Sequence, residues 1–269
     1  MAQGTRTLRL VMVGWGSLAR RTITLLQERN AQVDLVAIGL REGANRAAVP
    51  GTRVLIGAEA LERGLADLVV EAAGATAVEP WGQAAFAAGA DFAPISVSAL
   101  ADEATRDRLT AAADLANRRL LIPNGAIGGI DILRAAALLP LTRVEHIVTK
   151  PPAAWKGTPA ERMVDLDSVR TPHEFMVASA RVAAATFPQN GNATVTTALA
   201  GIGLDRTLVR LVVDPTVTAN RHTLRIEGAA GTYEICLSNR AMATNPKSSE
   251  MTALSLVTLI EREAGSFRA

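Results

Sequence analysis

The stretch Val11-Met12-Val13-Gly14-Trp15-Gly16-Ser17-Leu18-Ala19 passes from an apolar strand pattern into the spacing G-x-G-x-x-A near the start of the chain. Between a strand and a helix, this spacing is typical of dinucleotide binding. Gly14 permits a tight turn, and Gly16 lets backbone amides approach a pyrophosphate. Ala19 allows close helix-to-strand packing, and the helix N-terminus carries partial positive charge. The motif alone is weak, because short glycine patterns are often simply tight turns.

The residues around the loop supply the context that the motif requires. Apolar residues alternate over 8–13 as in a buried strand, and 17–29 has the period of an amphipathic helix. A second apolar run at 33–39 follows at the distance expected in a βαβ unit. We therefore interpret the loop as a phosphate-binding turn. Its residues expected to contact the cofactor are Gly14, Gly16, Ser17 and Leu18.

The rest of the first half alternates apolar runs with helical patterns. Further strands are predicted at 66–71, 91–95 and 119–122, and helices at 76–88 and 101–116. Such alternation favours a doubly wound parallel sheet, in which ligands bind beyond the carboxyl ends of the strands. Small-residue turns follow several of these strands, although any one of them could simply ease a turn. The strand-end residues expected in the cofactor site are Arg41, Ala73, Gly74 and Ser98.

The pattern changes after about residue 128. Helices are predicted at 128–139, at 172–187 with Thr171 as cap, and at 247–262. The strands predicted in this half are 143–149, 207–213, 221–228 and 231–237. The fold class is therefore α/β, an N-terminal Rossmann-type doubly wound parallel sheet with a C-terminal α+β domain. The expected division is 1–127 for dinucleotide binding, 128–244 for substrate binding and dimerisation, and 245–269 for a helix that packs back on the first domain.

Composition excludes several classes of protein. The chain has 269 residues and a net charge of +2, and only 3% of residues are aromatic, which argues against a nucleic-acid partner. No apolar run is long enough for a membrane span, and no secretory signal precedes the first strand, so we expect a cytoplasmic protein. The single cysteine, Cys236, excludes an intramolecular disulfide and a cysteine-rich metal site; we expect no metal. Its apolar strand pattern predicts an inert core thiol.

Lysine and histidine are scarce, which draws attention to the few present. The three lysines are Lys150, Lys156 and Lys247, and a compact ammonium would suit a dicarboxylate substrate, although codon bias explains the scarcity equally well. His222 stands where a loop enters a predicted strand, and an imidazole there can transfer protons during oxidation of an alcohol or amine. His146 is expected on a sheet face, and His173 in an exposed first helical turn.

Motifs spread over most of the chain resemble those of the L-aspartate dehydrogenase family. The most specific lie in the second half. The stretches that carry the resemblance are Gly14–Ala19, Val69–Gly74, Ser96–Leu100, Asn124–Asp131, Lys150–Pro152, Trp155–Glu161, Phe187–Asn192, Leu199–Thr207, Asp214–Pro215, Asn220–His222 and Asn245–Ser249. Three positions depart from the family pattern: Trp15, Asn124 and Gly191.

The resemblance implies an enzyme that oxidises L-aspartate with NAD or NADP, through iminosuccinate, to oxaloacetate and ammonia, or runs the reverse reaction. It implies that His222 is the active-site histidine and that Ala126 and Asn192 contact the nicotinamide cofactor. Family members are commonly dimers, and in some bacteria they feed iminosuccinate into NAD biosynthesis. The residues expected to recognise the substrate are Lys150, Asn190 and Lys247.

Cofactor choice and function leave alternatives. Arg41 would favour a 2′-phosphate and the adjacent Glu42 a ribose hydroxyl, so we expect either cofactor to be accepted, with NADP favoured. A related two-domain NAD(P) dehydrogenase acting on a different small carboxylate, such as a homoserine or semialdehyde dehydrogenase, is one alternative. A non-catalytic protein that senses dinucleotides is another.

Overall fold

The computed structural model describes residues 7–45 and 51–265, apart from the side chains of Gln189, Pro246 and Lys247. The chain divides into one unit of Met1–Pro123 with Thr252–Ala269 and a second unit of Asn124–Met251. These divisions differ from the expected ones at 127/128 and 244/245. One reason is that Asn239 donates a hydrogen bond from Nδ2 to the carbonyl of Ala126 (2.8 Å), which joins the turn after Pro123 to the second unit.

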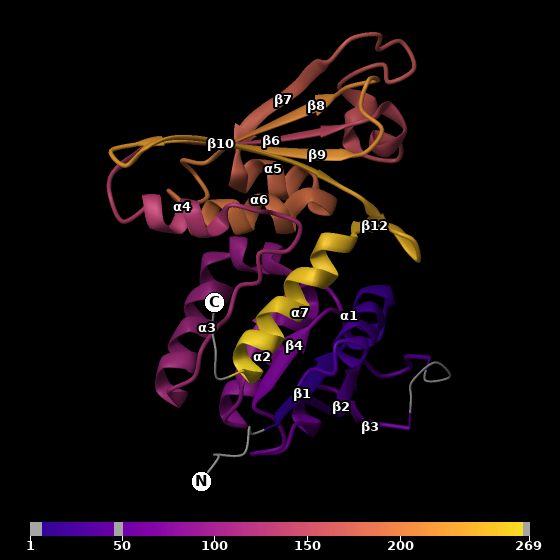
Figure 1. Ribbon diagram of the computed structural model, residues 1–269, viewed down its shortest axis with the longest axis vertical. Coiled ribbons are helices and arrows are strands. Elements are labelled where there is room, and N and C mark those ends of the chain that lie inside the picture. Colours follow the sequence, from indigo (N-terminus) through magenta and orange to yellow (C-terminus); the bar gives the residue numbers. More distant parts are fainter. Residues whose placement is uncertain (1–6, 46–50, 266–269) are drawn as a thin grey trace. The chain divides into compact units, whose positions relative to one another are not determined.

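The first unit is built on a parallel sheet, as predicted. Its strands are β1 (Leu8–Val13), β2 (Val33–Leu40), β3 (Arg53–Ile56), β4 (Leu68–Glu71) and β5 (Asp91–Pro94). They lie in the order β3-β2-β1-β4-β5, and every neighbouring pair is parallel (Figure 1). This order changes direction at β1, the point where open α/β sheets bind ligands. The doubly wound fold is therefore confirmed.

Helices cover both faces of this sheet. They are α1 (Ser17–Glu28), α2 (Ala75–Ala87), α3 (Glu103–Ala116) and α7 (Glu250–Ala264), with short 3-10 turns η1 (Ala58–Ala60) and η2 (Val97–Ala101). Asp102 caps α3 by accepting a hydrogen bond from the backbone of Thr105 (3.1 Å), and the helix ends where Asn117 adopts a left-handed φ of 52°.

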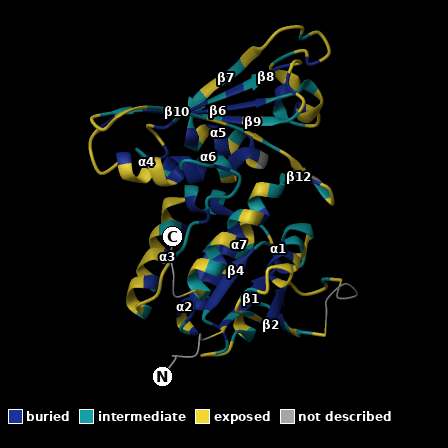
Figure 2. Ribbon diagram, viewed as in Figure 1, coloured by how far each residue is buried: buried dark blue, intermediate teal, exposed yellow. Residues whose placement is uncertain are grey.

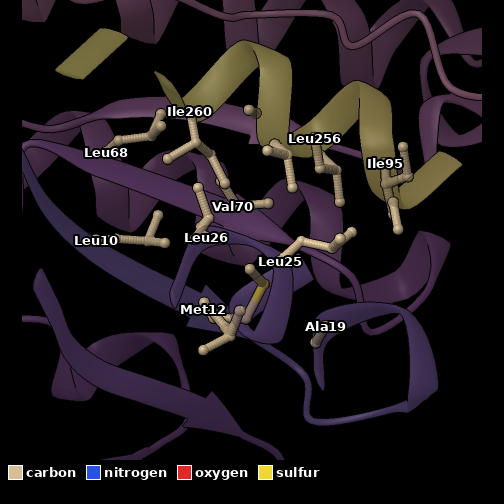
Figure 3. Close-up of a cluster of buried hydrophobic side chains, with 14 of the residues drawn as sticks. Leu10, Met12, Ala19, Leu25, Leu26, Leu68, Val70, Ile95, Leu256 and Ile260 are labelled. Atoms are coloured by element: carbon tan, nitrogen blue, oxygen red, sulfur yellow. The ribbon is translucent and has the colours of Figure 1, made fainter. Parts of the chain in front are cut away.

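The alternating side chains of β1 and β4 build a core on each face. On one face, Leu10, Met12 and Val70 pack with the apolar stripes of α1 and α7, and Leu256 and Ile260 come from α7 (Figure 3). Full burial of each such large side chain contributes about 1.5–3 kcal/mol. The last helix therefore belongs to the core of the first unit. On the opposite face, the aromatic rings of α2 and β5 meet edge to face.

One predicted strand of this unit is wrong. The segment 119–122 makes only an isolated bridge, between Leu120 and Phe92 of β5. The backbone of Phe92 donates to the carbonyl of Arg119 (3.0 Å) and accepts from Leu121 (2.8 Å), after which Pro123 cannot donate to a ladder. The short edge strand β3 has no counterpart among the predicted elements.

The second unit is a mixed sheet with helices on one face. Its strands are β6 (Leu141–Lys150), β7 (His173–Ser179), β8 (Leu208–Val213), β9 (Asn220–Gly228) and β10 (Gly231–Asn239), in the order β10-β9-β6-β8-β7. Only β6 and β8 are parallel. The remaining elements are α4 (Ile130–Ala136), η3 (Pro152–Trp155), η4 (Pro159–Arg162), α5 (Ala180–Thr186), α6 (Pro188–Ala200), β11 (Ala241–Met242) and β12 (Asn245–Ser249).

Burial alternates along β8 and β9 of this sheet (Figure 2). In β9, His222, Leu224 and Ile226 are buried, whereas Arg225, one position out of phase, is exposed. The three helices α4, α5 and α6 lie on one side of the sheet (Figure 1). These helices leave the other side of the sheet uncovered, and His222 lies on the covered side.

The long helix predicted at 172–187 is wrong. Residues 173–179 form β7, which pairs antiparallel with β8, and the helix begins only at Ala180. Its N-cap is Ser179, which accepts a hydrogen bond from the backbone of Val182, rather than Thr171. Pairing with a neighbouring strand has overridden the local helix signal at Pro172.

Two other elements also differ from expectation. Helix α6 was not predicted, because its Gly, Asn and Thr residues are poor helix formers. Its core side chains, Val195 and Ala198, are fully buried, so packing stabilises it. The last helix begins at Glu250 rather than 247, because 245–249 pairs with β11 as β12. No helix among the described residues is both long and apolar enough to cross a membrane.

Candidate active site

The glycine loop leaves β1 in a conformation that requires glycine. Gly14 has a φ of +87°, and its N–H donates to the carbonyl of Gly39 in β2 (2.8 Å). A Cβ added at Gly14 would lie 2.8 Å from the carbonyl oxygen of Ala72, which follows β4. A larger residue is therefore excluded at Gly14 by both backbone angle and space. Gly16, in contrast, has open space around its Cα.

The N-terminus of α1 is suited to an anion. Gly16 is the N-cap and supplies no side-chain cap, and the first turn contains no acidic residue. Ser17 and Leu18 form this first turn, so uncapped backbone N–H groups and the helix dipole lie beside the glycine loop. The residues present therefore fit a pyrophosphate. Trp15, the departure inside the motif, packs partly buried against the core that α1 shares with α7.

A buried carboxylate organises the neighbouring loops. Glu71, at the end of β4, is fully buried. Its Oε1 accepts hydrogen bonds from the backbone of Ala73 (2.6 Å) and Gly74 (2.7 Å) and from Ser96 Oγ (3.0 Å), while its Oε2 accepts from the backbone of Ser96 (3.1 Å). Burial raises the pKa of Glu71, and these four donors oppose that rise. The loops after β4 and β5 are thus held to one side chain.

The remaining residues expected in the cofactor site of this unit lie at the same edge of the sheet. Arg41 is exposed and directly follows β2, and Ser98 lies in η2 after β5. Ala73 and Gly74 lie between β4 and α2. The structure therefore brings together, beyond the carboxyl ends of β1, β2, β4 and β5, all eight residues of this unit that were expected to bind cofactor. These are Gly14, Gly16, Ser17, Leu18, Arg41, Ala73, Gly74 and Ser98.

In the second unit, Lys150 lies in a small polar site at the end of β6. Its Nζ donates to Asn190 Oδ1 (2.6 Å) and stands 5.0 Å from the centroid of the Trp155 ring. Asn190, buried in the first turn of α6, has no acidic neighbour in that turn. Burial lowers the pKa of Lys150 to about 8. The amine is therefore still charged at neutral pH, although its charged form is less favourable here than in water.

His222 lies on the same covered face as Lys150. Its side chain is buried, and its Nδ1 stands 2.9 Å from Nε2 of the fully buried His146. Burial, with a smaller contribution from the positive charge of Lys150, lowers the pKa of His222 to about 4. The imidazole is therefore neutral at pH 7 and free to accept a proton. Asp214, which belongs to the motif before His222, accepts hydrogen bonds from the backbone and hydroxyl of Thr216 and shapes the turn instead.

The other expected residues of the second unit are less close to this group. Asn192 is exposed two residues after Asn190 in α6, and Ala126 accepts the hydrogen bond from Asn239. The side chain of Lys247 lies outside the described part of the chain, although its backbone belongs to β12. His173 is exposed as expected, but it lies in β7 rather than in a helix.

The expectation of a core thiol is wrong. Cys236 is exposed. It pairs with Thr223 in the register of β9 and β10, and because side chains alternate along a strand, it faces away from His222. Local apolarity predicted burial, but β10 is an edge strand whose outer face no helix covers. This placement does not bring the thiol to the histidine.

Several residues of the site escaped prediction. The carboxylate of Glu71 lies inside a motif, but its hydrogen bonds to two loops were not predicted. Thr197, whose Oγ1 lies 3.0 Å from His146 Nδ1, belongs to the unpredicted helix α6. Trp155 carried no signal beyond its place in a family motif. A strand end that places an acid directly before small residues, as in Glu71-Ala72-Ala73-Gly74, is the one signal that pointed to such a role.

Comparisons with known proteins agree with this arrangement. A family model described as "Aspartate dehydrogenase, C-terminal" matches residues 131–263, and one described as "Homoserine dehydrogenase, NAD binding domain" matches residues 14–123. The solved structure of an aspartate dehydrogenase from Thermotoga maritima has a TM-score of 0.78 at 22% identity, covering 97% of this chain and 99% of that one. That likeness shows the fold.

Relatives similar in sequence extend over nearly the whole chain. An L-aspartate dehydrogenase from Pseudomonas aeruginosa is 37% identical over 264 residues, covering 96% of this chain and 98% of its own. One from Brucella anthropi is 47% identical over 259 residues, covering 96% of this chain and 97% of its own. Identity of this degree over this length shows that the chain belongs to the L-aspartate dehydrogenase family.

Proposed function

We propose that the protein catalyses the NAD(P)-dependent oxidation of L-aspartate to iminosuccinate, which water converts to oxaloacetate and ammonia, and the reverse reductive amination. One observation carries the proposal: a buried neutral imidazole, His222, shares a face with a cationic lysine, Lys150, that is bonded to Asn190. A proton acceptor beside an ammonium suits removal of a proton from the amine of an anionic substrate. Family membership supports this choice of substrate.

The first unit supplies the residues that would hold the dinucleotide. Gly14 and Gly16 open the loop, the first turn of α1 presents backbone N–H groups, and Arg41 after β2 suits a 2′-phosphate. The match to an NAD-binding domain over 14–123 supports this assignment. A bound nicotinamide ring supplies the acceptor for the hydride that leaves the substrate Cα.

The second unit supplies the groups proposed to handle the substrate. The ammonium of Lys150 and the uncapped N-terminus of α6 favour a carboxylate. Because the charge of Lys150 lowers the pKa of His222, a carboxylate that pairs with Lys150 raises that pKa again. Substrate binding would thus make His222 a better base. It takes the proton from the amine, or from the water that attacks the imine carbon.

The experiment follows oxidation of NADH or NADPH in the presence of oxaloacetate and ammonia, with wild type and His222→Ala. Loss of a general acid–base group predicts a fall in kcat of about 10²–10⁴-fold, while affinity for the dinucleotide remains. His173→Ala is the matched control, because that histidine is exposed and lies in another strand.

Three results would contradict the proposal. A wild-type enzyme that binds dinucleotide but turns over no substrate would favour the sensor. One that reduces another small keto acid or aldehyde faster would favour the related dehydrogenase. Full kcat in His222→Ala would remove the histidine from its role.

The proposal includes a homodimer located in the cytoplasm, where NAD and NADP are available. Only one face of the second sheet is covered by helices. The other carries Arg143, which pairs with Glu145 (2.7 Å), and Arg210, which pairs with Glu145 (3.0 Å) and with Glu174 (2.9 Å). A second copy could cover this face through a two-fold interface. Light scattering across a concentration series measures the mass, and a monomer at every concentration would contradict this part.

A further inference from the structure

One chain of hydrogen bonds joins three side chains from three elements: His222 in β9, His146 in β6 and Thr197 in α6. His222 Nδ1 lies 2.9 Å from His146 Nε2, and His146 Nδ1 lies 3.0 Å from Thr197 Oγ1. Thr197, in α6, is fully buried, as is His146 in β6. All three belong to the second unit, so the chain of contacts is internal to one body. Among the residues that the structure describes, the other ring nitrogen, His222 Nε2, has no hydrogen-bond partner.

The protons of this chain can be placed by counting donors. The hydroxyl of Thr197 has one proton and lies near two partners, the carbonyl oxygen of Ala193 one helical turn earlier (3.1 Å) and His146 Nδ1 (3.0 Å). We assign the proton to the carbonyl, which can only accept, so that the hydroxyl oxygen accepts from His146 Nδ1–H. Burial and the adjacent His222 keep the pKa of His146 well below its usual value, so His146 is neutral and carries a single N–H.

The remaining assignment follows from that neutrality. With its proton on Nδ1, His146 can only accept at Nε2. The bond to His222 therefore runs from His222 Nδ1–H to His146 Nε2. A neutral His222 then has no proton on Nε2, and this nitrogen presents a lone pair.

We propose that His146 and Thr197 are positioning residues that fix His222 in the tautomer with Nδ1 protonated and Nε2 free, so that Nε2 is the atom that takes the proton from the substrate. This inference rests on the proposed role of His222. The chain does with a neutral imidazole and a hydroxyl what a carboxylate does behind many catalytic histidines, namely hold the ring by its second nitrogen. Among the described residues, the groups that hold His222 from behind are a neutral imidazole and a hydroxyl, so no carboxylate there stabilises an imidazolium.

The test compares two substitutions at Thr197. Thr197→Val keeps the shape and removes the acceptor for His146 Nδ1–H, so the proton on His146 is no longer held on Nδ1. Thr197→Ser keeps the hydroxyl. We expect kcat to fall about 10–100-fold in Thr197→Val, as for other partners that orient a reacting group. KM for L-aspartate and Kd for the dinucleotide should stay within about twofold, and Thr197→Ser should remain close to wild type.

A second measurement reads the tautomer without turnover. The chain has three histidines, so ¹⁵N-histidine labelling gives few imidazole signals, and the exposed His173 serves as internal reference. In wild type, His222 should show a protonated Nδ1 and an unprotonated Nε2. In Thr197→Val, signal from protonated Nε2 should appear, and Thr197→Ser should retain the wild-type pattern.

The outcomes separate this inference from the proposed function. A wild-type His222 with its proton on Nε2 overturns it even if Thr197→Val fails to fold. So does a Thr197→Val enzyme with unchanged kcat, or equal losses in Thr197→Val and Thr197→Ser. If instead the wild-type tautomer is as assigned but His222→Ala keeps full activity, the proposed function fails. The hydrogen bonds from His222 through His146 to Thr197 then remain as a structural feature.

Discussion

At the scale of single residues, Lys150 determines how the site responds to pH. Its ammonium is held by Asn190 and lies over Trp155, yet no carboxylate pairs with it among the residues that the structure describes. Burial therefore dominates and lowers the pKa of Lys150 to about 8, whereas the exposed Lys156 pairs with Asp167 and has a raised pKa. The pKa values of two lysines six positions apart are thus shifted in opposite directions.

This difference predicts the alkaline limb of the rate profile. Lys150 is charged below pH 8 and loses its charge above it, so kcat/KM for L-aspartate should fall about tenfold per pH unit beyond that point. Lys150→Arg should move the fall to higher pH, because a guanidinium stays charged. Lys156→Met is the control. A break near pH 8 that persists in Lys150→Met would assign it to another group.

Individual residues show what sequence can and cannot predict. Gly14 was predictable, because its conformation is required by the turn it makes within a few residues. The hydrogen bonds from His222 through His146 to Thr197 were not predictable, because they exist only after β6, β9 and α6 have packed together. Cys236 was mispredicted for the same reason: an apolar neighbourhood in sequence does not say which face of a sheet is covered.

At the scale of elements, the loop between β1 and α1 contains two glycines with different requirements. Gly14 is needed for the backbone conformation, whereas Gly16 is needed only for contact with the ligand. Gly14→Ala should lower both the melting temperature and the affinity for NADPH, because its φ is +87° and a Cβ would lie 2.8 Å from the carbonyl oxygen of Ala72. Gly16→Ala meets no atom within 4 Å, so it should leave the melting temperature unchanged and weaken only NADPH binding. Thermal unfolding and fluorescence titration measure both. Equal melting temperatures for the two variants would contradict this account.

The loops after β4 and β5 depend on one carboxylate. Glu71→Gln replaces one acceptor oxygen by an NH₂ group. That group would face a backbone N–H, so at least one hydrogen bond is lost and two donor groups point at each other. The free energy of unfolding should fall by about 1–3 kcal/mol, and dinucleotide affinity should fall with it. Urea unfolding and NADPH titration are the measurements, with Glu28→Gln as control, because Glu28 is exposed at the far end of α1 from the glycine loop. Unchanged stability would show that the four bonds contribute little.

Elements differ in how far their own residues determine them. The parallel strands β1, β2 and β4 are apolar runs bounded by turns, and their predicted positions hold within two residues. Segment 173–179 follows a local helix signal but lies beside β8, and pairing with β8 makes it a strand. Helix α6 has weak propensity throughout and forms because its buried side chains pack against the sheet.

At the scale of the whole molecule, two buried histidines make the free energy of unfolding depend on pH in the acidic range. The unfolded chain binds a proton at His222 below about pH 6.5, whereas the folded chain does so only near pH 4. The free energy of unfolding should therefore fall by about 3 kcal/mol from this residue as pH falls from 6.5 to 4, and His146 acts in the same direction.

Urea unfolding at several pH values measures this dependence. His222→Gln should have a shallower slope between pH 6.5 and 4 than wild type, whatever its absolute stability, and the exposed His173→Gln should keep the wild-type slope. Equal slopes in wild type and His222→Gln would mean that His222 titrates alike in the folded and unfolded chains.

The exposed position of Cys236 has a practical consequence. It is the only thiol in the sequence, and it lies on the uncovered face of the second sheet, turned away from His222. A maleimide spin label would therefore attach at a single defined point without any prior mutagenesis. That face is the one proposed to receive a second copy, so a label there should weaken the association of two copies, and light scattering before and after labelling would test whether this face is the interface.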